Sequence, residues 1–271
     1  TEMAAHVQSL AAHLKEFCGL DETSKVMDIG SNDGTFLNKL AGNSIQLVGV
    51  DPNSIDMKEF YSPEITIIPE FYSNKILPGT KFDLITSIAM FYDVEDPISF
   101  AKDIESSLTP EGVWFFEQSY AVTMFENNSF DTICHEHLMY YTLRSLNRVL
   151  TSANLKIINI KLSSANGGSI GIYATKINSQ RTSEVNIDEL LKIENEKLPT
   201  LVANFKTSVE MLKLEVKKFV SEQIQLGKTI WGIGASTKGN TILSYFELDS
   251  SCIQGIADKN PLKLGRVTPG T

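Results

Sequence analysis

The stretch VMDIGSNDG, residues 26–34, decides the fold of this chain. Apart from Asp28, its first four residues suit a β-strand; the other five form a turn with a glycine at each end, and apolar residues at helical spacing follow. A strand, a tight turn and a helix in this order open a nucleotide-binding βαβ unit. Gly30 and Gly34 allow a sharp turn and let a ligand approach the backbone where a Cβ would clash.

The second strand of the unit, Ile45–Val50, is followed by Asp51, where a carboxylate can accept hydrogen bonds from ribose hydroxyls. A pyrophosphate cradle has the pattern Gly-x-Gly-x-x-Gly, but here Asn32 stands at the second glycine position, with Asp33 beside it. A carboxylate in the turn repels a diphosphate and suits a cationic ligand without phosphate. The turn therefore favours S-adenosylmethionine (SAM) over NAD, and a generic turn that binds nothing is the alternative.

The spacing Asp28-x-Gly30-x-Asn32-x-Gly34 resembles motif I of the class I SAM-dependent methyltransferases, many of which have glycine at the position of Asn32. The resemblance implies that these four residues and Asp51 bind the cofactor. The rest of the predicted cofactor set lies at or after the ends of the second, third and fourth strands: Pro52, Glu70, Phe71, Ile88 and Ala89.

Composition excludes several classes of protein. With 271 residues, 42% hydrophobic and 21% charged, the chain is globular and long enough for one large or two ordinary domains. A net charge of −9 argues against a nucleic-acid surface. We find no apolar run near the roughly 18 residues of a membrane span and no secretory signal. Cys18, Cys134 and Cys252 are too scattered for a disulfide framework or a zinc site, so a cytoplasmic location is expected.

Strand and helix patterns then alternate as in a doubly wound α/β sheet. The remaining predicted strands are Ile65–Ile68, Phe82–Ser87 and Val113–Glu117, closed by the hairpin pair Leu155–Lys161 and Ser169–Thr175. The predicted helices are Met3–Cys18, which either covers the cofactor cleft or only packs; a short one capped by Asn53 or Ser54; one from Asp96-Pro97 through Leu108, followed by a turn at Thr109–Gly112; and Leu143–Ala153.

A long helical connector follows, with Asp188 as its predicted cap and with Pro199 expected to kink or restart it. A second strand, glycine turn and helix begin at Thr229, and Ile253–Asp258 is the next predicted strand. The helix N-terminus after Gly234 favours an anion, and Lys238 adds a positive charge, so this turn is expected to hold a phosphate. Only two strands of this unit are present, and we expect a longer polypeptide or a partner chain to complete it.

Two of the four histidines lie in one tripeptide, His135-Glu136-His137, which follows the fifth strand and Tyr120. Ligands bind beyond the carboxyl ends of the strands in open α/β sheets, so both stretches should face the cofactor. A histidine with a pKa near neutrality can remove a proton from a carbon next to a carbonyl, and Glu136 can orient it. The spacing of the two histidines does not suit a metal, and a pair that only packs is the alternative.

Four motifs carry a closer resemblance, to the sugar C-methyltransferases, which methylate a carbon of nucleotide-linked keto-deoxysugars. The motifs are CHEHLMYY at 134–141, LRSL at 143–146, NGGS at 166–169 and GASTKGNT at 234–241. The resemblance implies that His137 is the catalytic base, assisted by Glu136. It also implies a substrate site that contains Tyr120, Cys134, Asn166, Ala235 and Lys238, in which the turn around Gly234 and Lys238 holds the nucleotide diphosphate. Family members usually have tyrosine at the position of Cys134, and they carry an N-terminal zinc domain and a longer C-terminal domain.

The sequence thus predicts a doubly wound, Rossmann-like SAM-methyltransferase sheet, a helical connector and a partial second Rossmann-like unit. The predicted segments are an N-terminal helix (1–24), a methyltransferase domain (25–178), the connector (179–227) and a substrate-binding unit (228–271). The predicted function is C-methylation of a small molecule next to a carbonyl through a histidine base and an enolate. An O-methyltransferase, an NAD-dependent oxidoreductase and a SAM-binding but inactive chain are the alternatives.

Overall fold

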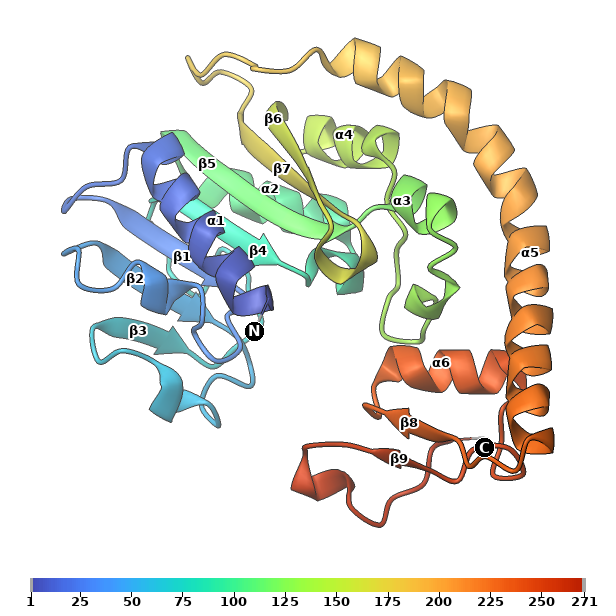
Figure 1. Ribbon diagram of the computed structural model, residues 1–271. Coiled ribbons are helices and arrows are strands. Elements are labelled where there is room, and N and C mark those ends of the chain that lie inside the picture. The colour runs from blue at the N-terminus through green and yellow to red at the C-terminus, as the bar shows by residue number, and fades with distance from the viewer. Residues whose placement is uncertain (1, 270–271) are drawn as a thin grey trace. The chain divides into compact units, whose positions relative to one another are not determined.

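Residues 2–269 are described by a computed structural model, with the side chains of residues 2–4 and of Asn166 outside this description (Figure 1). The chain divides into two compact units. One consists of Thr1–Ala121 with Leu138–Glu194, and the other of Val122–His137 with Asn195–Thr271. The second unit therefore takes a short segment from the middle of the chain, and this segment contains the His-Glu-His tripeptide. The four segments predicted from the sequence stay a prediction.

A seven-stranded sheet with the order β3-β2-β1-β4-β5-β7-β6 forms the first unit. Its strands are β1 (Lys25–Ile29), β2 (Gln46–Val50), β3 (Ile65–Ile68), β4 (Phe82–Ile88), β5 (Leu108–Ser119), β6 (Leu155–Ser163) and β7 (Ser169–Lys176). The first five strands pair in parallel, whereas β7 pairs antiparallel with both β5 and β6. The predicted doubly wound, Rossmann-like fold is confirmed, and the carboxyl ends of the five parallel strands share one edge.

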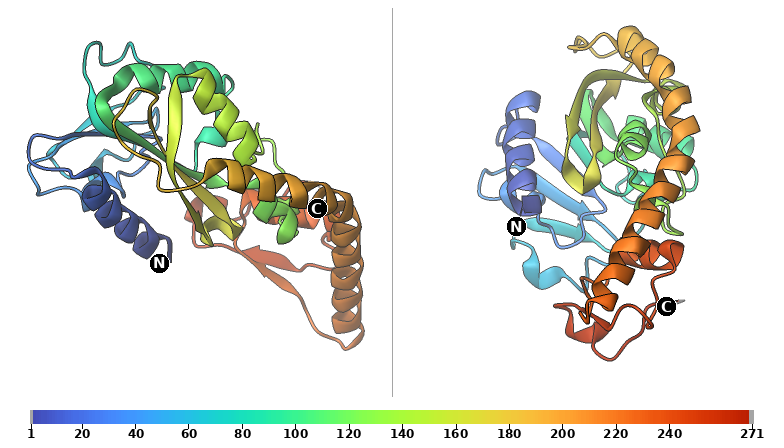
Figure 2. Two further views of the ribbon diagram at one scale, coloured as in Figure 1. Left: turned by 90° about the horizontal axis from the view of Figure 1, so that it is seen from above. Right: turned by 45° about the vertical axis from the view of Figure 1, so that its right-hand side comes forward.

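Helices cover both faces of this sheet. The views in Figures 1 and 2 show α1 (Glu2–Cys18) along one face, where Leu10 and Leu14 join the core with Phe115 of β5. Alternate residues of a strand point to opposite faces, so Trp114 lies on the other side, against Phe91 and Phe100. The two remaining helices wholly within this unit are α2 (Pro97–Ser107) and α4 (Leu143–Ser152).

Two predicted helices are wrong. After Gly34 the structure has only a 3-10 turn at Leu37–Lys39, and the left-handed conformations of Gly42 and Ser44 prevent a helix from continuing past it. The segment after Asp51 likewise contains only a 3-10 turn, Lys58–Phe60. Its apolar side chains are largely exposed there, so no buried face stabilises a helix.

Two further boundaries differ from the prediction. Strand β5 begins at Leu108, and a shift in its pairing with β4 absorbs the predicted turn at Thr109–Gly112. Helix α5 (Ile187–Gln225) is capped by Asn186, whose side chain accepts the Glu189 N–H at 3.2 Å, and not by the predicted Asp188. The helix also continues through Pro199, so it does not restart there, and the alternative of a kink at Pro199 stays a prediction.

The second unit contains the predicted strand, turn and helix: β8 (Trp231–Ile233), α6 (Thr237–Phe246) and β9 (Gly255–Ala257). The two strands pair in parallel. A small core of Phe130, Val209, Val220, Phe246 and Leu248 holds α6 against the C-terminal part of α5 and the 3-10 turn Phe130–Thr132. A short helix, α3 (Ala121–Glu126), was not predicted. Over residues 2–269, no helix has the length and apolar character to span a membrane.

Candidate active site

The glycine turn after β1 is held to the end of β2 by backbone hydrogen bonds. The Gly30 N–H donates to the Val50 carbonyl at 2.9 Å, and the Asn32 N–H donates to the Asp51 carboxylate at 3.0 Å. Gly30 and Gly34 have φ angles of 74° and 72°, and Asn32 has a φ angle of 45°. The turn thus requires glycine at both of its ends, as the sequence indicated.

The Tyr61 side chain stabilises this turn through its hydroxyl, a role that the sequence did not predict. Its hydroxyl donates to the Asn32 carbonyl at 2.8 Å and lies 2.8 Å from the Ser31 hydroxyl. A Cβ on Gly34 would come within 2.6 Å of the Tyr61 ring, so ring and turn fit only in the absence of that atom. Burial raises the pKa of Tyr61 and keeps its hydroxyl protonated. No local pattern marks Tyr61, because its partners lie 29 and 30 residues earlier.

Asp51 lies where the sequence placed it, directly after β2. One oxygen accepts the Asn32 N–H and the other accepts the Asn53 N–H at 2.7 Å. An ionised carboxylate has about four lone-pair positions, so two remain for a ligand. Asp51 can therefore hold the turn and still accept hydrogen bonds from a ribose.

Asp28 is buried inside the sheet, with 4% of its surface exposed. The Thr86 hydroxyl of β4 donates to its carboxylate at 2.6 Å. Burial raises the pKa of Asp28 to about 7, an effect that the Thr86 hydrogen bond opposes and the nearby Asp51 charge reinforces. Asp28 therefore connects β1 to β4 inside the sheet, just before the turn, and its contact with a cofactor stays a prediction.

The other predicted cofactor residues lie at the ends of β2, β3 and β4. Pro52 and Ile88 are half-buried, whereas Glu70 and Phe71 are exposed, the Phe71 side chain to 82%. Ala89 has a φ angle of 55°, and its N–H donates to the Glu117 carbonyl of β5 at 2.7 Å. The chain after β3 and β4 is thus fixed at the same edge of the sheet as the glycine turn.

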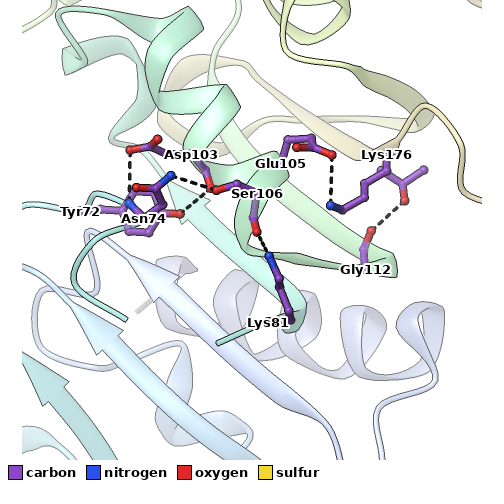
Figure 3. A network of polar contacts seen from close by, with 9 residues as sticks. Tyr72, Asn74, Lys81, Asp103, Glu105, Ser106, Gly112 and Lys176 are labelled. Carbon is purple, nitrogen blue, oxygen red and sulfur yellow. Dashed lines mark hydrogen bonds and ion pairs between the residues drawn. The ribbon is translucent and has the colours of Figure 1, made fainter. Parts of the chain in front are cut away.

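The loop that contains Phe71 is attached to helix α2 by a network of polar contacts (Figure 3). The Tyr72 hydroxyl donates to the Asp103 carbonyl at 3.1 Å, and the Asn74 N–H donates to the Asp103 carboxylate at 3.2 Å. The Lys81 ammonium donates to the Ser106 carbonyl at the end of α2. These contacts hold the loop near both of its ends, so Glu70 and Phe71, which the sequence predicts to contact the cofactor, have a defined position.

Tyr120 and Asn166 are the two predicted substrate residues of the first unit. The Tyr120 hydroxyl donates to Glu194 of α5 at 2.7 Å. Asn166 belongs to the 3-10 turn Ala165–Gly167, and its side chain lies outside the described residues. In the same unit the carboxylate of the buried Glu117 lies 2.8 Å from the ring of the half-buried His6 of α1, a contact that no local sequence pattern marks.

The tripeptide His135-Glu136-His137 lies on a turn of the second unit, in which the His137 N–H donates to the Cys134 carbonyl at 3.3 Å. His135 and Glu136 are exposed, the side chain of His135 to 86%, whereas Cys134 and His137 are half-buried. Of the two histidines, His137 therefore has the more protected ring. Within residues 2–269, no group of three or more histidine, cysteine or acidic side chains could hold a metal.

The environment of His137 lowers its pKa. Burial has the largest effect and the Lys238 charge adds to it, whereas a hydrogen bond with the Thr132 backbone and the Glu136 charge oppose it. The ring is therefore neutral near pH 7 and can accept a proton. The predicted base and the predicted substrate residue Lys238 interact within one unit.

The second glycine turn repeats the geometry of the first. The Gly234 N–H donates to the Ala257 carbonyl of β9 at 2.8 Å. Asp258 follows β9 and accepts the Ala235 N–H on one oxygen and the Asn260 N–H on the other, both at 2.8 Å. Asp258 thus corresponds to Asp51, a parallel that the strand pattern could have shown.

Charge at the second turn is more balanced than the sequence indicated. The Asp258 carboxylate already uses the Ala235 N–H, one of the groups expected to face a phosphate. Lys263 lies 3.2 Å from that carboxylate and donates to the Ala235 carbonyl at 2.6 Å. The predicted site residues therefore form two groups. The cofactor set, Tyr120 and Asn166 belong to the first unit, and the second contains Cys134, Glu136, His137, Ala235 and Lys238.

Comparison with known proteins gives matches along nearly the whole chain. Residues 3–160 match the family model described as methyltransferase domain, and residues 164–271 match the C-methyltransferase C-terminal domain. The chain is similar to the C-methyltransferase NovU of Streptomyces niveus, with 27% identity over 98% of this chain and 65% of NovU. It is also similar to a tRNA U34 carboxymethyltransferase of Campylobacter jejuni subsp. doylei, with 33% identity over 40% of this chain and 39% of that protein. The chain thus spans less than two-thirds of the length of these curated relatives.

Two solved structures share the fold at a TM-score of 0.51. One belongs to the complex between the Haloferax volcanii Trm112 methyltransferase activator and a methyltransferase; it has 13% identity and covers 65% of this chain and 94% of its own. The other is the mitomycin 7-O-methyltransferase MmcR, with 11% identity over 64% of this chain and 53% of its own.

Asp28 predicts a pH dependence of stability. Its pKa in the folded chain is raised from 3.8 to about 7, so its stabilising contribution is complete below pH ~4 and is lost as the pH rises to about 7. The slope from one such group is at most about 1.4 kcal/mol per pH unit. Urea denaturation should show that Asp28→Asn flattens this decline. Exposed Asp56→Asn serves as the control, and an unchanged slope in Asp28→Asn would contradict the assignment.

Tyr61→Phe should weaken SAM binding about tenfold, because the ring stays in place while two hydrogen bonds to the turn are lost. Titration calorimetry measures the effect. Tyr245→Phe, which removes a hydroxyl from the other unit, should leave the affinity unchanged. Equal affinity of Tyr61→Phe and the wild type would show that the turn does not depend on this hydroxyl.

Proposed function

Because this chain belongs to the methyltransferase-domain family, with SAM as its co-substrate, we propose that it methylates a carbon next to a carbonyl group in a nucleotide-linked keto-deoxysugar. The observation that carries the proposal is the half-buried His137, whose pKa is lowered in a chain that matches the C-methyltransferase C-terminal domain. The alternative of an NAD-dependent oxidoreductase is wrong, since the first 160 residues match a methyltransferase domain.

The first unit fits SAM. Asp51 keeps lone pairs for the ribose hydroxyls. Gly30 is required at the turn because a Cβ there would come within 2.9 Å of the Met90 side chain. Asp33 and Asp51 give this edge a negative charge that suits a sulfonium ion. When bound, SAM supplies an electrophilic methyl group.

His137 performs the proton transfer in this proposal. A neutral imidazole removes the proton from the carbon next to the ketone, and the electron pair of that C–H bond passes into the enolate. The proton stays on the ring as imidazolium, stabilised by the Glu136 charge. Transfer to carbon requires reacting atoms roughly 3 Å apart, so the protein must orient the acceptor as well as deprotonate it.

The second glycine turn supports a nucleotide-linked acceptor. Asp258 follows β9 as Asp51 follows β2, and it likewise accepts one N–H from the turn and one from the chain that follows. Besides its contact with Lys263, it keeps a lone pair for a ribose hydroxyl of the acceptor. Lys238, in the first turn of α6, supplies a positive charge for the diphosphate. The sugar would then extend from the nucleotide toward the turn that carries His137, within the same unit.

His137→Asn tests the base. We expect this change to lower turnover at least about a hundredfold, because an amide cannot accept the proton, while SAM affinity stays within about twofold. Transfer of labelled methyl groups from SAM to a nucleotide-linked keto-deoxysugar measures turnover, and analysis of the product locates the methyl group. Exposed His135→Asn is the matched control and should retain activity. Methylation of an oxygen atom, or full activity in His137→Asn, would refute the proposal.

The pH profile tests the state of His137. Activity should fall as the pH drops through a midpoint below the ordinary histidine pKa, since the protonated ring is not a base. Lys238→Met removes a charge that lowers this pKa, so the midpoint of kcat against pH should move to higher pH. Exposed Lys259→Met provides a control with the same change in net charge. A midpoint that does not move in Lys238→Met would exclude this electrostatic coupling.

A further inference from the structure

We propose that Glu194 of α5 is a positioning residue that fixes both ends of the segment carrying His137. Glu194 is a buried carboxylate with 3% of its surface exposed, in a helix whose neighbouring acidic residues face solvent. Burial of a carboxylate is costly unless hydrogen bonds satisfy it, so its partners indicate why it is there.

Three donors from the first unit converge on this carboxylate. The Tyr120 hydroxyl donates to one oxygen at 2.7 Å, and the Leu143 N–H donates to the same oxygen at 2.6 Å. The Arg144 N–H donates to the other oxygen at 2.9 Å. Leu143 and Arg144 are the first residues of α4, whose positive N-terminal end favours a negative charge.

These contacts lie where the chain leaves and re-enters the first unit. The segment Val122–His137 begins two residues after Tyr120 and ends at the residue before Leu138. On its departing side, Tyr120 is bound by Glu194, and the Ala121 N–H donates to the Tyr141 carbonyl at 2.9 Å. On its returning side, the N–H groups of Leu138 and Met139 donate to the Tyr92 carbonyl, both at 3.1 Å. Glu194 also binds Leu143 and Arg144, a few residues after this return, and is itself the last residue of the unit. One carboxylate therefore contacts the chain near all three crossings.

Glu194 thus acts on turnover through other residues, without a role in proton transfer. An amide in place of the carboxylate keeps one acceptor oxygen but places an NH2 group opposite the Leu143 N–H. Two donors then face each other, and the hydrogen bond to the start of α4 is lost. The residues that flank the segment with His137 would then be held less firmly, and the position of His137 would vary more. Misplacement of a catalytic group by about 1 Å can lower a rate a hundredfold even when the mutated residue is remote.

Hydrogen exchange tests the anchoring without reference to activity. In Glu194→Gln we expect faster amide exchange across residues 122–142 than in the wild type, with SAM affinity within about twofold. Glu196→Gln, an exposed glutamate two residues further along α5, is the matched control and should show the wild-type pattern. Unchanged exchange in Glu194→Gln, or a general increase over the whole sheet, would overturn the proposal.

Kinetics test the consequence for turnover, which rests on the proposed function. Glu194→Gln should lower kcat about ten- to a hundredfold with acceptor KM within about threefold. Tyr120→Phe, which leaves both α4 hydrogen bonds intact, should produce a smaller loss, and the effects of the two changes should not be additive. An unchanged kcat in Glu194→Gln would overturn the role in turnover. Failure of the proposed function appears separately, as activity retained in His137→Asn.

Discussion

A single carboxylate at the end of a strand holds the glycine turn in each of the two units of this protein. In the first unit Asp51 accepts an N–H from the glycine turn and another from the chain that follows it, and in the second unit Asp258 does the same. Backbone N–H groups in a tight turn have few other acceptors. The turn therefore has its shape before any ligand binds, so little ordering has to occur on binding.

The electrostatic character of the two halves differs in degree. Near the first turn the charges are carboxylates, although burial raises the pKa of Asp28 to about 7, so this carboxyl is only partly ionised near neutral pH and the local negative charge is reduced. At the second turn Lys263 pairs with Asp258, and Lys238 lies within range of His137. A cation suits the first half, whereas an anionic or neutral nucleotide suits the second.

The order of strands and turns could be predicted from the sequence, because apolar strands and glycine turns are local patterns. The spacing of Phe36, Leu37 and Leu40 predicted a helix, but it reflects only that these three side chains are buried. The segment forms one 3-10 turn, and the left-handed Gly42 prevents a longer helix. The roles of Tyr61 and Glu194 depend on partners some thirty to seventy residues away in the chain, so no local pattern reveals them. In an amphipathic helix a glutamate such as Glu194 is expected to face water.

The two tryptophans provide a separate optical signal for each unit. Trp114 is fully buried under the aromatic rings of the first unit, whereas Trp231 in β8 is 60% exposed, its ring against Gly255. An indole in an apolar core emits at shorter wavelength than one in water, and a dissolved quencher reaches only the exposed one. Fluorescence quenching can therefore follow the second unit in the intact chain, while a red shift of the protected emission reports the opening of the methyltransferase sheet.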